Sequence, residues 1–318
     1  MEHVIAALVA LAFDKWIGDP EHLPHPVRLI GALISKLDRA FNQGRFRKGK
    51  GVLTVLIVSI CCFLIPLAII TVAYQLHLII GIAVEAVLIF TTIALNDLEK
   101  AARRVEIPLR AGDFTEARAK LGWIVGRDTD TLGESEIVRG TVETVSENTS
   151  DGITAPLFYA LLGGAPLAFF YRGVNTCDAM LGYKNEKYIS FGWASARLDD
   201  LLNLIPSRLT GIAMLLANAK KYNKHVGHLV KKLPIHARKH PSPNSGWCEA
   251  ATALLLGVQL GGQNHYQGTI SNRPLIGTKT VSLATAHIHE AIQIMKRTTV
   301  MFLTFISLGV LIIDYLFT

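Results

Sequence analysis

Residues 127–152 hold seven carboxylates, a density of acidic side chains that suits the binding of a cation and, through it, of a phosphorylated ligand. They are Asp128, Asp130, Glu134, Glu136, Glu143, Glu147 and Asp151. Arg127 and Arg139 lie among them, and an apolar run at 153–171 follows directly. This stretch therefore combines charge-bearing groups with a neighbouring segment of membrane type.

A helix would place part of this cluster on one face. Thr131-Leu-Gly-Glu134 has the pattern of a capping box, which predicts a helix from about Gly133 to Asn148. Four charged residues then follow at spacings of 3, 4 and 4 and share a face: Glu136, Arg139, Glu143 and Glu147. Acids gathered on one face repel one another unless a cation holds them. A solvated acidic face is the alternative for any single residue, whereas the whole cluster favours Mg²⁺.

The composition is that of a membrane protein. Of 318 residues, 50% are hydrophobic and only 18% are charged, where a soluble domain usually carries about a quarter. Residues 52–73 contain no charged side chain, and a run of this length can cross a hydrocarbon core of about 30 Å. The runs 76–95 and 298–318 each contain one acid, Glu85 and Asp314. We therefore predict an all-α, polytopic helical membrane protein.

Basic residues concentrate in two stretches. Residues 36–50 and 220–239 are rich in Lys and Arg, and no acid occurs between Leu201 and Cys248. Beside membrane spans, the positive-inside rule explains such blocks more simply than nucleic-acid binding, so we expect cytoplasmic loops and no nucleic-acid partner. The four cysteines show no metal-type spacing and no disulfide framework.

These patterns predict one integral membrane domain, 1–318. Spans are expected near 1–17, 52–73, 76–95 and 298–318, a cytosolic helical insert at 96–152, and broken apolar segments at 153–171, 201–217 and 250–260. The first run lacks a basic start and a cleavage site, so we interpret it as a retained segment. Gly163-Gly-Ala-Pro166 interrupts one broken segment. Because interrupted helices occur at membrane depth where they line a cavity, we expect broken or re-entrant helices around a pocket that faces the cytoplasm.

Three further segments carry polar residues. At 18–31, three prolines argue against a regular helix and display Asp19, His22, His25 and Arg28 on a stiff turn, where a capping role is the alternative. At 240–247, Asn244 or Ser245 should cap the following apolar helix. We expect a polar loop at 261–279 and an amphipathic helix at 280–297. Glu85 lacks an obvious basic partner, although acids inside the membrane are often functional.

Four motifs closely resemble the CbiB/CobD family of cobalamin biosynthesis, the adenosylcobinamide-phosphate synthases. They are GDPEHLPHPVRLIG at 18–31, GTVETVSENTSDG at 140–152, FGWASARLDD at 191–200 and HPSPNSGW at 240–247. The resemblance extends over essentially the whole chain, in the same order. It implies an amide bond between adenosylcobyric acid and (R)-1-amino-2-propanol O-phosphate, or aminopropanol, with ATP consumed.

This chemistry suggests roles for the polar residues. A carboxylate and an ammonium condense only if the carboxylate is activated, for example as an acyl phosphate, and if a base deprotonates the amine. We expect His22, His25, Glu143 and Glu147 to be catalytic, and Glu143, Glu147 and Asp151 to hold Mg²⁺. The expected substrate- and phosphate-binding residues are Asp19, Arg28, Arg127, Asp128, Arg139, Asn148, Arg172, Asn175, Asp178, Lys184, Asp199, Asp200, His240, Ser242, Asn244 and Ser245.

The expected partners are the corrinoid, aminopropanol phosphate and the lipid bilayer, with other late cobalamin-pathway membrane enzymes and a second copy of the chain left open. The expected location is the cell membrane, multi-pass, with the active site facing the cytoplasm. Two alternatives remain at this point. A corrinoid or amino-alcohol transporter would move its ligand without forming a bond, and a sensor or assembly scaffold would bind without turning over ATP.

Overall fold

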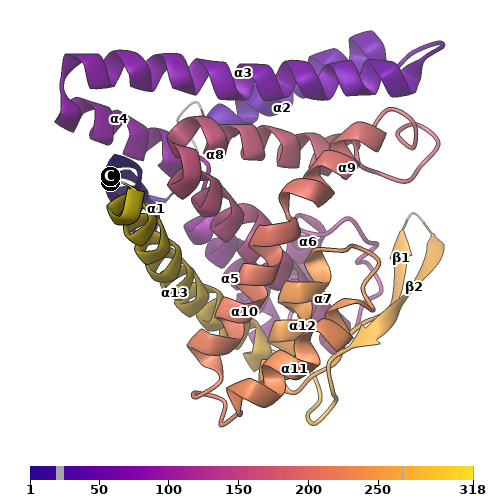
Figure 1. The fold of residues 1–318 in the computed structure, drawn as a ribbon. Coiled ribbons are helices and arrows are strands. Elements are labelled where there is room, and N and C mark those ends of the chain that lie inside the picture. The colour runs from indigo at the N-terminus through magenta and orange to yellow at the C-terminus, as the bar shows by residue number, and fades with distance from the viewer. Residues whose placement is uncertain (19–24, 267, 318) are drawn as a thin grey trace. The chain divides into compact units, whose positions relative to one another are not determined.

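The computed structural model describes residues 1–18, 25–266 and 268–317 and is almost entirely helical (Figure 1). The chain divides into two compact units. Unit 1 comprises Met1–Ala94, Asp151–Asn203 and Leu303–Thr318, and unit 2 comprises Leu95–Ser150 and Leu204–Phe302. The chain therefore passes from one unit to the other four times, and each unit is described by itself below.

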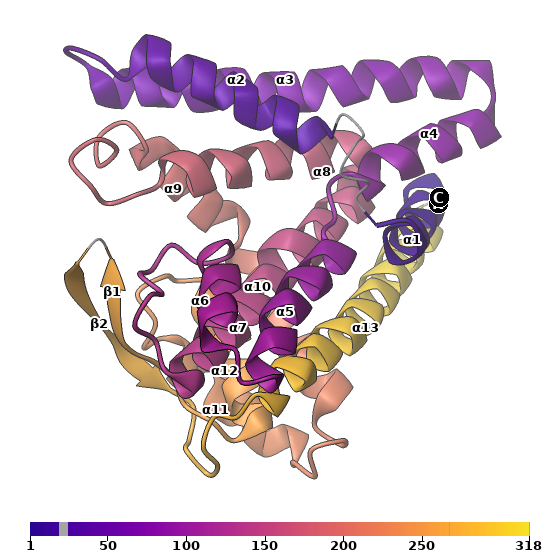
Figure 2. The ribbon, with the colours of Figure 1, turned by 180° about the vertical axis from the view of Figure 1, so that it is seen from behind.

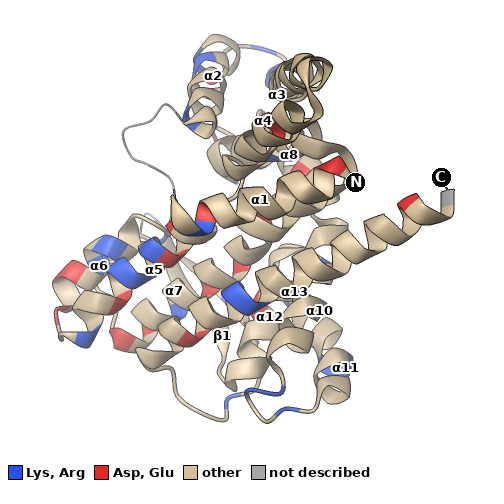
Figure 3. Ribbon diagram, turned by 90° about the vertical axis from the view of Figure 1, so that its left-hand side faces the viewer, with Lys and Arg blue, Asp and Glu red and all other residues tan. Residues whose placement is uncertain are grey.

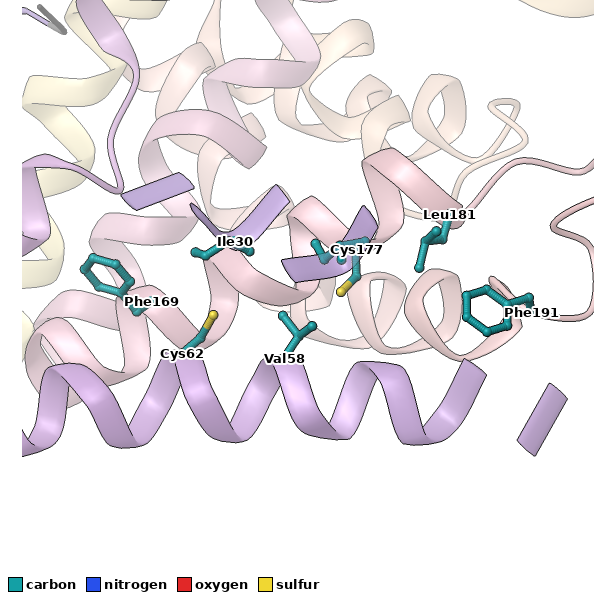
Figure 4. Packing of buried hydrophobic residues seen from close by; sticks show 8 residues of the cluster. Ile30, Val58, Cys62, Phe169, Cys177, Leu181 and Phe191 are labelled. Carbon is teal, nitrogen blue, oxygen red and sulfur yellow. The ribbon is translucent and has the colours of Figure 1, made fainter. Parts of the chain in front are cut away.

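Unit 1 is helical throughout its regular elements. They are α1 (Glu2–Trp16), α2 (Pro26–Phe41), α3 (Arg47–Leu76), α4 (Leu78–Phe90), α8 (Ala155–Leu181), α9 (Trp193–Leu202) and the end of α13 (Ala286–Phe317). The long helix α3 packs along α8, and α1 packs along α4 (Figure 1). Buried apolar side chains of α2, α3 and α8, with Phe191, form the core between these helices; Figure 4 shows Val58, Cys62 and Phe169 among them.

Unit 2 contains shorter helices and a hairpin. They are α5 (Leu95–Arg110), α6 (Phe114–Gly122), α7 (Glu134–Thr149), α10 (Leu204–Asn218), α11 (Val226–Ala237), α12 (Ser245–Leu256), β1 (Leu260–Tyr266), β2 (Thr269–Ile276) and the start of α13. Helices α6 and α7 pack against α5, as the view from behind shows (Figure 2). Helix α12 packs against α7, α10 and α11 and is buried on all sides, as its apolar composition requires.

The predicted fold class is confirmed. Among the described residues, four helical stretches are long and apolar enough to cross a membrane: Arg47–Leu76, Leu78–Arg110, Glu134–Leu181 and Ala286–Leu316. The pair Trp193–Leu202 and Leu204–Asn218 adds a fifth if it is counted as one span. Charged side chains colour α5 and α6 along their length (Figure 3), which agrees with the polar helices expected in 96–152. The side of the membrane on which they lie stays a prediction.

Local signals place several helix ends correctly. Asp113 caps α6, and its Oδ1 accepts a hydrogen bond from the Glu116 amide at 2.9 Å. The Pro66 ring is accommodated inside α3, whereas Pro26 occupies the first turn of α2. The expectation of a turn throughout 18–31 is therefore wrong from residue 26 onward, because proline at the first helical position has no amide that needs a partner. Arg28 lies on that helix.

The break in α8 is confirmed, and it contains the partner of Glu85. Gly163 and Gly164 leave helical geometry, with φ of +66° at Gly164. The next amide, that of Ala165, donates to Oε1 of Glu85 at 3.1 Å. A Cβ on Gly164 would lie 2.0 Å from that same oxygen, so the position requires glycine.

Two more groups complete the Glu85 environment. Nδ1 of His3 lies 2.9 Å from Oε1, and the Tyr74 hydroxyl donates to Oε2 at 2.6 Å. Glu85, on α4, is fully buried. Through these contacts its carboxyl group links α4 to α1, α3 and the broken helix α8. The basic partner that the sequence did not reveal is a histidine more than eighty positions away in the chain.

We expect Glu85→Ala to lower the free energy of unfolding by about 3 kcal/mol, because the buried Ala165 amide and the partly buried His3 and Tyr74 side chains would lose their shared partner. Thermal melting of the purified full-length protein in detergent measures this effect. Glu85→Gln retains an acceptor oxygen and should lose less. Equal melting temperatures for Glu85→Ala and the wild type would show that this network does not stabilise unit 1.

Candidate functional site

The acidic helix predicted from the sequence is α7, which begins at Glu134 with Gly133 as its N-cap. Oε2 of Glu136 accepts a hydrogen bond from the Gly133 amide at 3.0 Å, so the reciprocal contact lies two residues later than the predicted Thr131–Glu134 pair. Glu134 instead accepts from the Thr285 hydroxyl at 2.7 Å. Glu143 and Glu147 remain on one face of this helix, as the spacing predicts.

Arg127 and Glu143 form a buried ion pair in unit 2. Nη2 of Arg127 donates to Oε2 of Glu143, and the two side chains are only 6% and 3% exposed. The Glu143 Oε1 atom accepts from the Gly261 amide at 2.8 Å. Nη1 of Arg127 donates to Oδ1 of Asn264 at 2.8 Å. The carboxylate is therefore neutralised by a guanidinium and by the backbone of β1.

Arg139 binds the same hairpin. Its Nη1 donates to the Gly261 carbonyl, and its Nη2 donates to the Gln263 carbonyl at 2.7 Å and to Oδ1 of Asn264 at 2.9 Å. Its Nε lies 4.0 Å from Oε1 of Glu143. Two of the four arginines predicted to bind substrate or phosphate, Arg127 and Arg139, thus lie together, each bonded to Asn264 and close to Glu143.

Asp128 makes two hydrogen bonds to the hairpin. The Asp128 amide donates to the His265 carbonyl at 2.8 Å, and Oδ2 of Asp128 accepts from the Gly268 amide at 2.8 Å. Gly261 and Gly262 have φ of +83° and +93° and form the bulge that bends β1 beneath Arg139. Asp128 therefore positions the strands, which is a different role from the predicted contact with phosphate.

The 240–247 motif meets α7 through Ser245, whose Oγ donates to Oε1 of Glu147 at 2.7 Å. Ser242 Oγ accepts from the amides of Asn244 and Ser245, at 3.2 and 3.3 Å. The Ser242 amide donates to Nδ1 of His240 at 3.0 Å. Nη1 of Arg208, on α10, donates to Oδ1 of Asn244 at 3.3 Å. The 240–247 motif therefore lies against Glu147 of α7 within unit 2.

Glu249 lies beneath the motif and faces His240. Its Oε1 is 3.4 Å from Nε2 of His240, and the two side chains are 1% and 7% exposed. Burial, together with the negative charge of Glu143 and Glu147, raises the pKa of Glu249 well above its ordinary value. Burial also lowers the pKa of His240, so the low-dielectric surroundings disfavour the charged form of both groups.

We expect Glu249→Gln to be more stable than the wild type at about pH 8, with the difference closing towards pH 5. The folded protein keeps a proton on Glu249 that the unfolded chain releases near the ordinary pKa of 4.5. The free energy of unfolding therefore falls as the pH rises above that value. Melting curves across this pH range test the sign, with Glu136→Gln as an exposed control. Parallel pH profiles for wild type and Glu249→Gln would contradict it.

A second polar cluster lies within unit 1. Nδ2 of Asn175 donates to Oδ1 of Asp199 at 3.1 Å, and Nη1 of Arg172 lies 3.4 Å from both Oδ1 of Asn175 and the Asp151 carbonyl. Asn203 donates to Oδ2 of Asp199 at 3.1 Å. Four predicted site residues, Asp151, Arg172, Asn175 and Asp199, are therefore neighbours.

The remaining predicted residues are more dispersed. His25 caps α2, since its Nδ1 accepts from the Val27 amide at 3.3 Å. Asn148 donates to the Thr144 carbonyl at 3.0 Å within α7. Asp178 lies near the end of α8, Lys184 is exposed in the following loop, and Asp200 is on α9. Asp19 and His22 lie outside the described residues.

The predicted trio of Mg²⁺ ligands does not fit a preformed metal site. Glu143 is occupied by Arg127 and by the Gly261 amide. Within the described ranges, no group of three or more His, Cys, Asp or Glu side chains could hold a metal ion. No step proposed below depends on a resident metal.

Sequence reasoning missed the hairpin and the residues it contributes. Its strands are polar, so they lack the apolar alternation that marks a half-buried strand, and 261–279 resembled a loop. Asn264, Tyr266 and Arg273 therefore went unnoticed. Glu249 also went unnoticed, because a single acid at the start of an apolar helix resembles a first-turn charge. Gly268, before a Thr-Ile pair, was a weak turn signal among several Gly, Asn and Pro residues of this segment.

The fold and site define a helical, polytopic membrane protein with a buried arginine–carboxylate cluster between a helix and a hairpin. A family profile described as CobD/CbiB protein matches residues 7–295, and the chain belongs to this family. The cobalamin biosynthesis protein CobD of Halalkalibacterium halodurans is 55% identical over 306 residues, which are 96% of each chain. The CbiB proteins of Salmonella paratyphi B and Salmonella typhimurium are each 43% identical over 298 residues, 92% of each chain. No solved structure matches.

Proposed function

We propose that this protein, whose family has a role in cobalamin biosynthesis, joins adenosylcobyric acid to (R)-1-amino-2-propanol O-phosphate, or to aminopropanol, through an amide bond. ATP supplies the driving force, and the product is adenosylcobinamide phosphate from the phosphorylated amine or adenosylcobinamide from aminopropanol. The observation that carries the proposal is the cluster of Arg127, Arg139, Glu143, Glu147 and Ser245, which gathers cations and one accessible carboxylate.

The reaction needs an activated acyl group and a free amine. In the proposed sequence, a propionate oxygen of the corrinoid attacks the γ-phosphorus of ATP and ADP leaves. The amine nitrogen then attacks the acyl carbon, and phosphate leaves with the carboxylate oxygen. The ammonium must first give up a proton, and Glu147 is the described carboxylate best suited to accept it. Glu147 is half-buried, and among the described residues it accepts one hydrogen bond, from the Ser245 hydroxyl.

The arginines would stabilise the phosphate oxygens while charge shifts between them. Arg139 is the better candidate for direct contact, because Arg127 is committed to Glu143 and Asn264. Mg²⁺ enters the proposal only as the counter-ion of ATP. His22 and His25 remain sequence-based candidates for the base, and His25 caps a helix of unit 1.

We also propose that the protein lies in the cell membrane as a multi-pass protein with its active site towards the cytoplasm. The basic stretch at 220–239, which belongs to unit 2, supports this orientation through the positive-inside rule. The bilayer is then a partner, and membrane-bound enzymes of the same pathway or a second copy of the chain could also associate.

We expect a cysteine at position 184 to be modified only by reagents that enter the cytoplasm. Lys184 is exposed in the loop after α8, so a maleimide can reach it. Cys61 is the least buried native cysteine and is replaced first, because it would add background. Labelling of intact cells with an impermeant maleimide measures the orientation. Modification from outside would refute the proposed topology.

The proposed activity is tested by supplying purified protein in detergent with adenosylcobyric acid, aminopropanol phosphate and Mg-ATP. Mass spectrometry should detect adenosylcobinamide phosphate, and formation of ADP should match it in amount. A protein that consumes no ATP and yields no amide would rule out the synthase. The same assay with aminopropanol identifies the accepted amine.

One observation favours a second candidate, a corrinoid or amino-alcohol transporter. Interrupted membrane helices often form transporter binding sites, and α8 breaks at Gly163–Gly164 beside the buried Glu85. Proteoliposomes distinguish the two functions. A transporter accumulates its ligand unchanged, whereas the synthase forms a new covalent bond.

A further inference from the structure

Arg273 makes no ion-pair contact with a carboxylate in the part of the chain that the structure describes, although, against the effect of burial, the negative charges of Glu249, Glu143 and Glu147 raise its pKa. The ion pairs there include those of Arg127 and Arg139 with Glu143, but none to Arg273. The one hydrogen bond of Arg273 among these residues is from Nη2 to the Tyr266 hydroxyl at 3.0 Å. A half-buried guanidinium that lacks a carboxylate contact needs another anion nearby, or its burial is unfavourable.

The strand register places Arg273 on the face that meets α7. Gly262 pairs with Arg273, and Asn264 pairs with Ser271. Opposed residues of an antiparallel pair point to the same side, so Arg273 and Asn264 share a face of the hairpin. Asn264 contacts Arg127 and Arg139 through Oδ1. The hairpin therefore brings Arg273 to the side that holds the other two arginines.

Two buried donors on this face also lack acceptors among the described residues. They are Nδ2 of Asn264, whose residue is 2% exposed, and Nε of Arg139. Buried N–H groups in folded proteins are nearly always hydrogen-bonded. Unused donors beside a guanidinium without an ion-pair contact favour an acceptor with negative charge. The charges of this region also favour an anion. Arg127, Arg139 and Arg273 outnumber Glu143 and Glu147, and the raised pKa of Glu249 favours its uncharged form.

We propose that Arg273, Asn264 and Arg139 form a phosphate-binding site on the hairpin. The flat guanidinium fork matches two oxygens of a phosphate, and the Asn264 amide and Arg139 Nε can donate to others. The Tyr266 hydroxyl accepts a hydrogen bond from Nη2 of Arg273 and so orients the guanidinium group. This inference deepens the proposed function, because that reaction offers two phosphate sources, the amine phosphate and ATP.

Binding of inorganic phosphate to the full-length protein in detergent tests the site without any turnover. Titration calorimetry at constant ionic strength should show phosphate binding to the wild type. Arg273→Gln should weaken it about tenfold or more, since hydrogen bonds to charged groups contribute strongly. Arg273→Lys should lose less, because it keeps the charge. Lys279→Gln, which removes an exposed cation just beyond the hairpin, is the matched control and should bind as the wild type does.

If Arg273→Gln does not fold, Tyr266→Phe gives the same answer, because it removes only the hydroxyl that orients the fork and should weaken phosphate binding severalfold. Unchanged phosphate affinity in the folded variants would overturn the proposal. So would an equal loss in Lys279→Gln, because phosphate would then respond to overall charge.

Steady-state kinetics of Arg273→Gln identify the source of the phosphate. A rise of about tenfold in KM for aminopropanol phosphate, with KM for ATP unchanged, assigns the site to the amine, and the reverse assigns it to the nucleotide. Unchanged KM values for both would overturn the role in substrate binding. A wild type that forms no amide would refute the proposed function alone, because the phosphate titration does not depend on catalysis.

Discussion

Glu147→Gln is expected to reduce amide formation at least about a hundredfold while leaving the protein level and the melting temperature unchanged. Glu147 is half-buried, and its one hydrogen bond among the described residues comes from Ser245. The amide oxygen of glutamine can still accept that bond. The substitution therefore removes a charge and a proton acceptor and little else. The rate of adenosylcobinamide phosphate formation by the purified protein measures the loss.

Two control variants separate catalysis from structure. Glu136→Gln makes the same change on the same helix, where the side chain only accepts from the Gly133 amide, and should keep full activity. Ser245→Ala removes the hydrogen bond but leaves the carboxylate, so a loss of less than about tenfold is expected. Full activity in Glu147→Gln would remove Glu147 from the catalytic site.

The membrane fold could be predicted because long apolar runs and glycine–proline interruptions act locally. The run at 52–73 lies inside α3, and Gly163-Gly-Ala-Pro166 marks the break in α8. Helix ends were predicted less well, since α3 extends to Arg47 and α8 continues to Leu181. Polar residues at those ends are compatible with a helix, and composition alone gives no reason to extend it through them.

The parts of the site that could not be predicted depend on contacts between segments far apart in the sequence. The spacing of Glu143 and Glu147 placed both on one face, and the four motifs drew attention to Ser245. The pairing of Glu143 with Arg127 depends on a loop sixteen residues earlier, and its contact with Gly261 depends on a polar hairpin without a strand pattern. His3, likewise, becomes the partner of Glu85 only when α1 packs against α4. Neither pairing leaves a periodic signal in the sequence.

The buried pair of Arg127 and Glu143 leads to the largest expected effect on stability. Removing one member of a buried ion pair leaves the other charge without compensation, which destabilises proteins by about 3 to 5 kcal/mol. Glu143→Leu should therefore lower the free energy of unfolding by that amount, and the Gly261 amide would lose its acceptor as well. Unfolding of the purified protein in denaturant, followed by circular dichroism, measures the change.

The double variant Arg127→Met with Glu143→Leu distinguishes an ion pair from two independent contributions. Because neither charge remains, the double variant should be more stable than Glu143→Leu alone, and most of the loss should be recovered. Its activity should still fall, since Arg127 orients Asn264 and, through it, Arg139 on the hairpin. Losses that simply add in the double variant would mean that the two side chains stabilise unit 2 separately. The arginine would then be available to a phosphate rather than committed to Glu143.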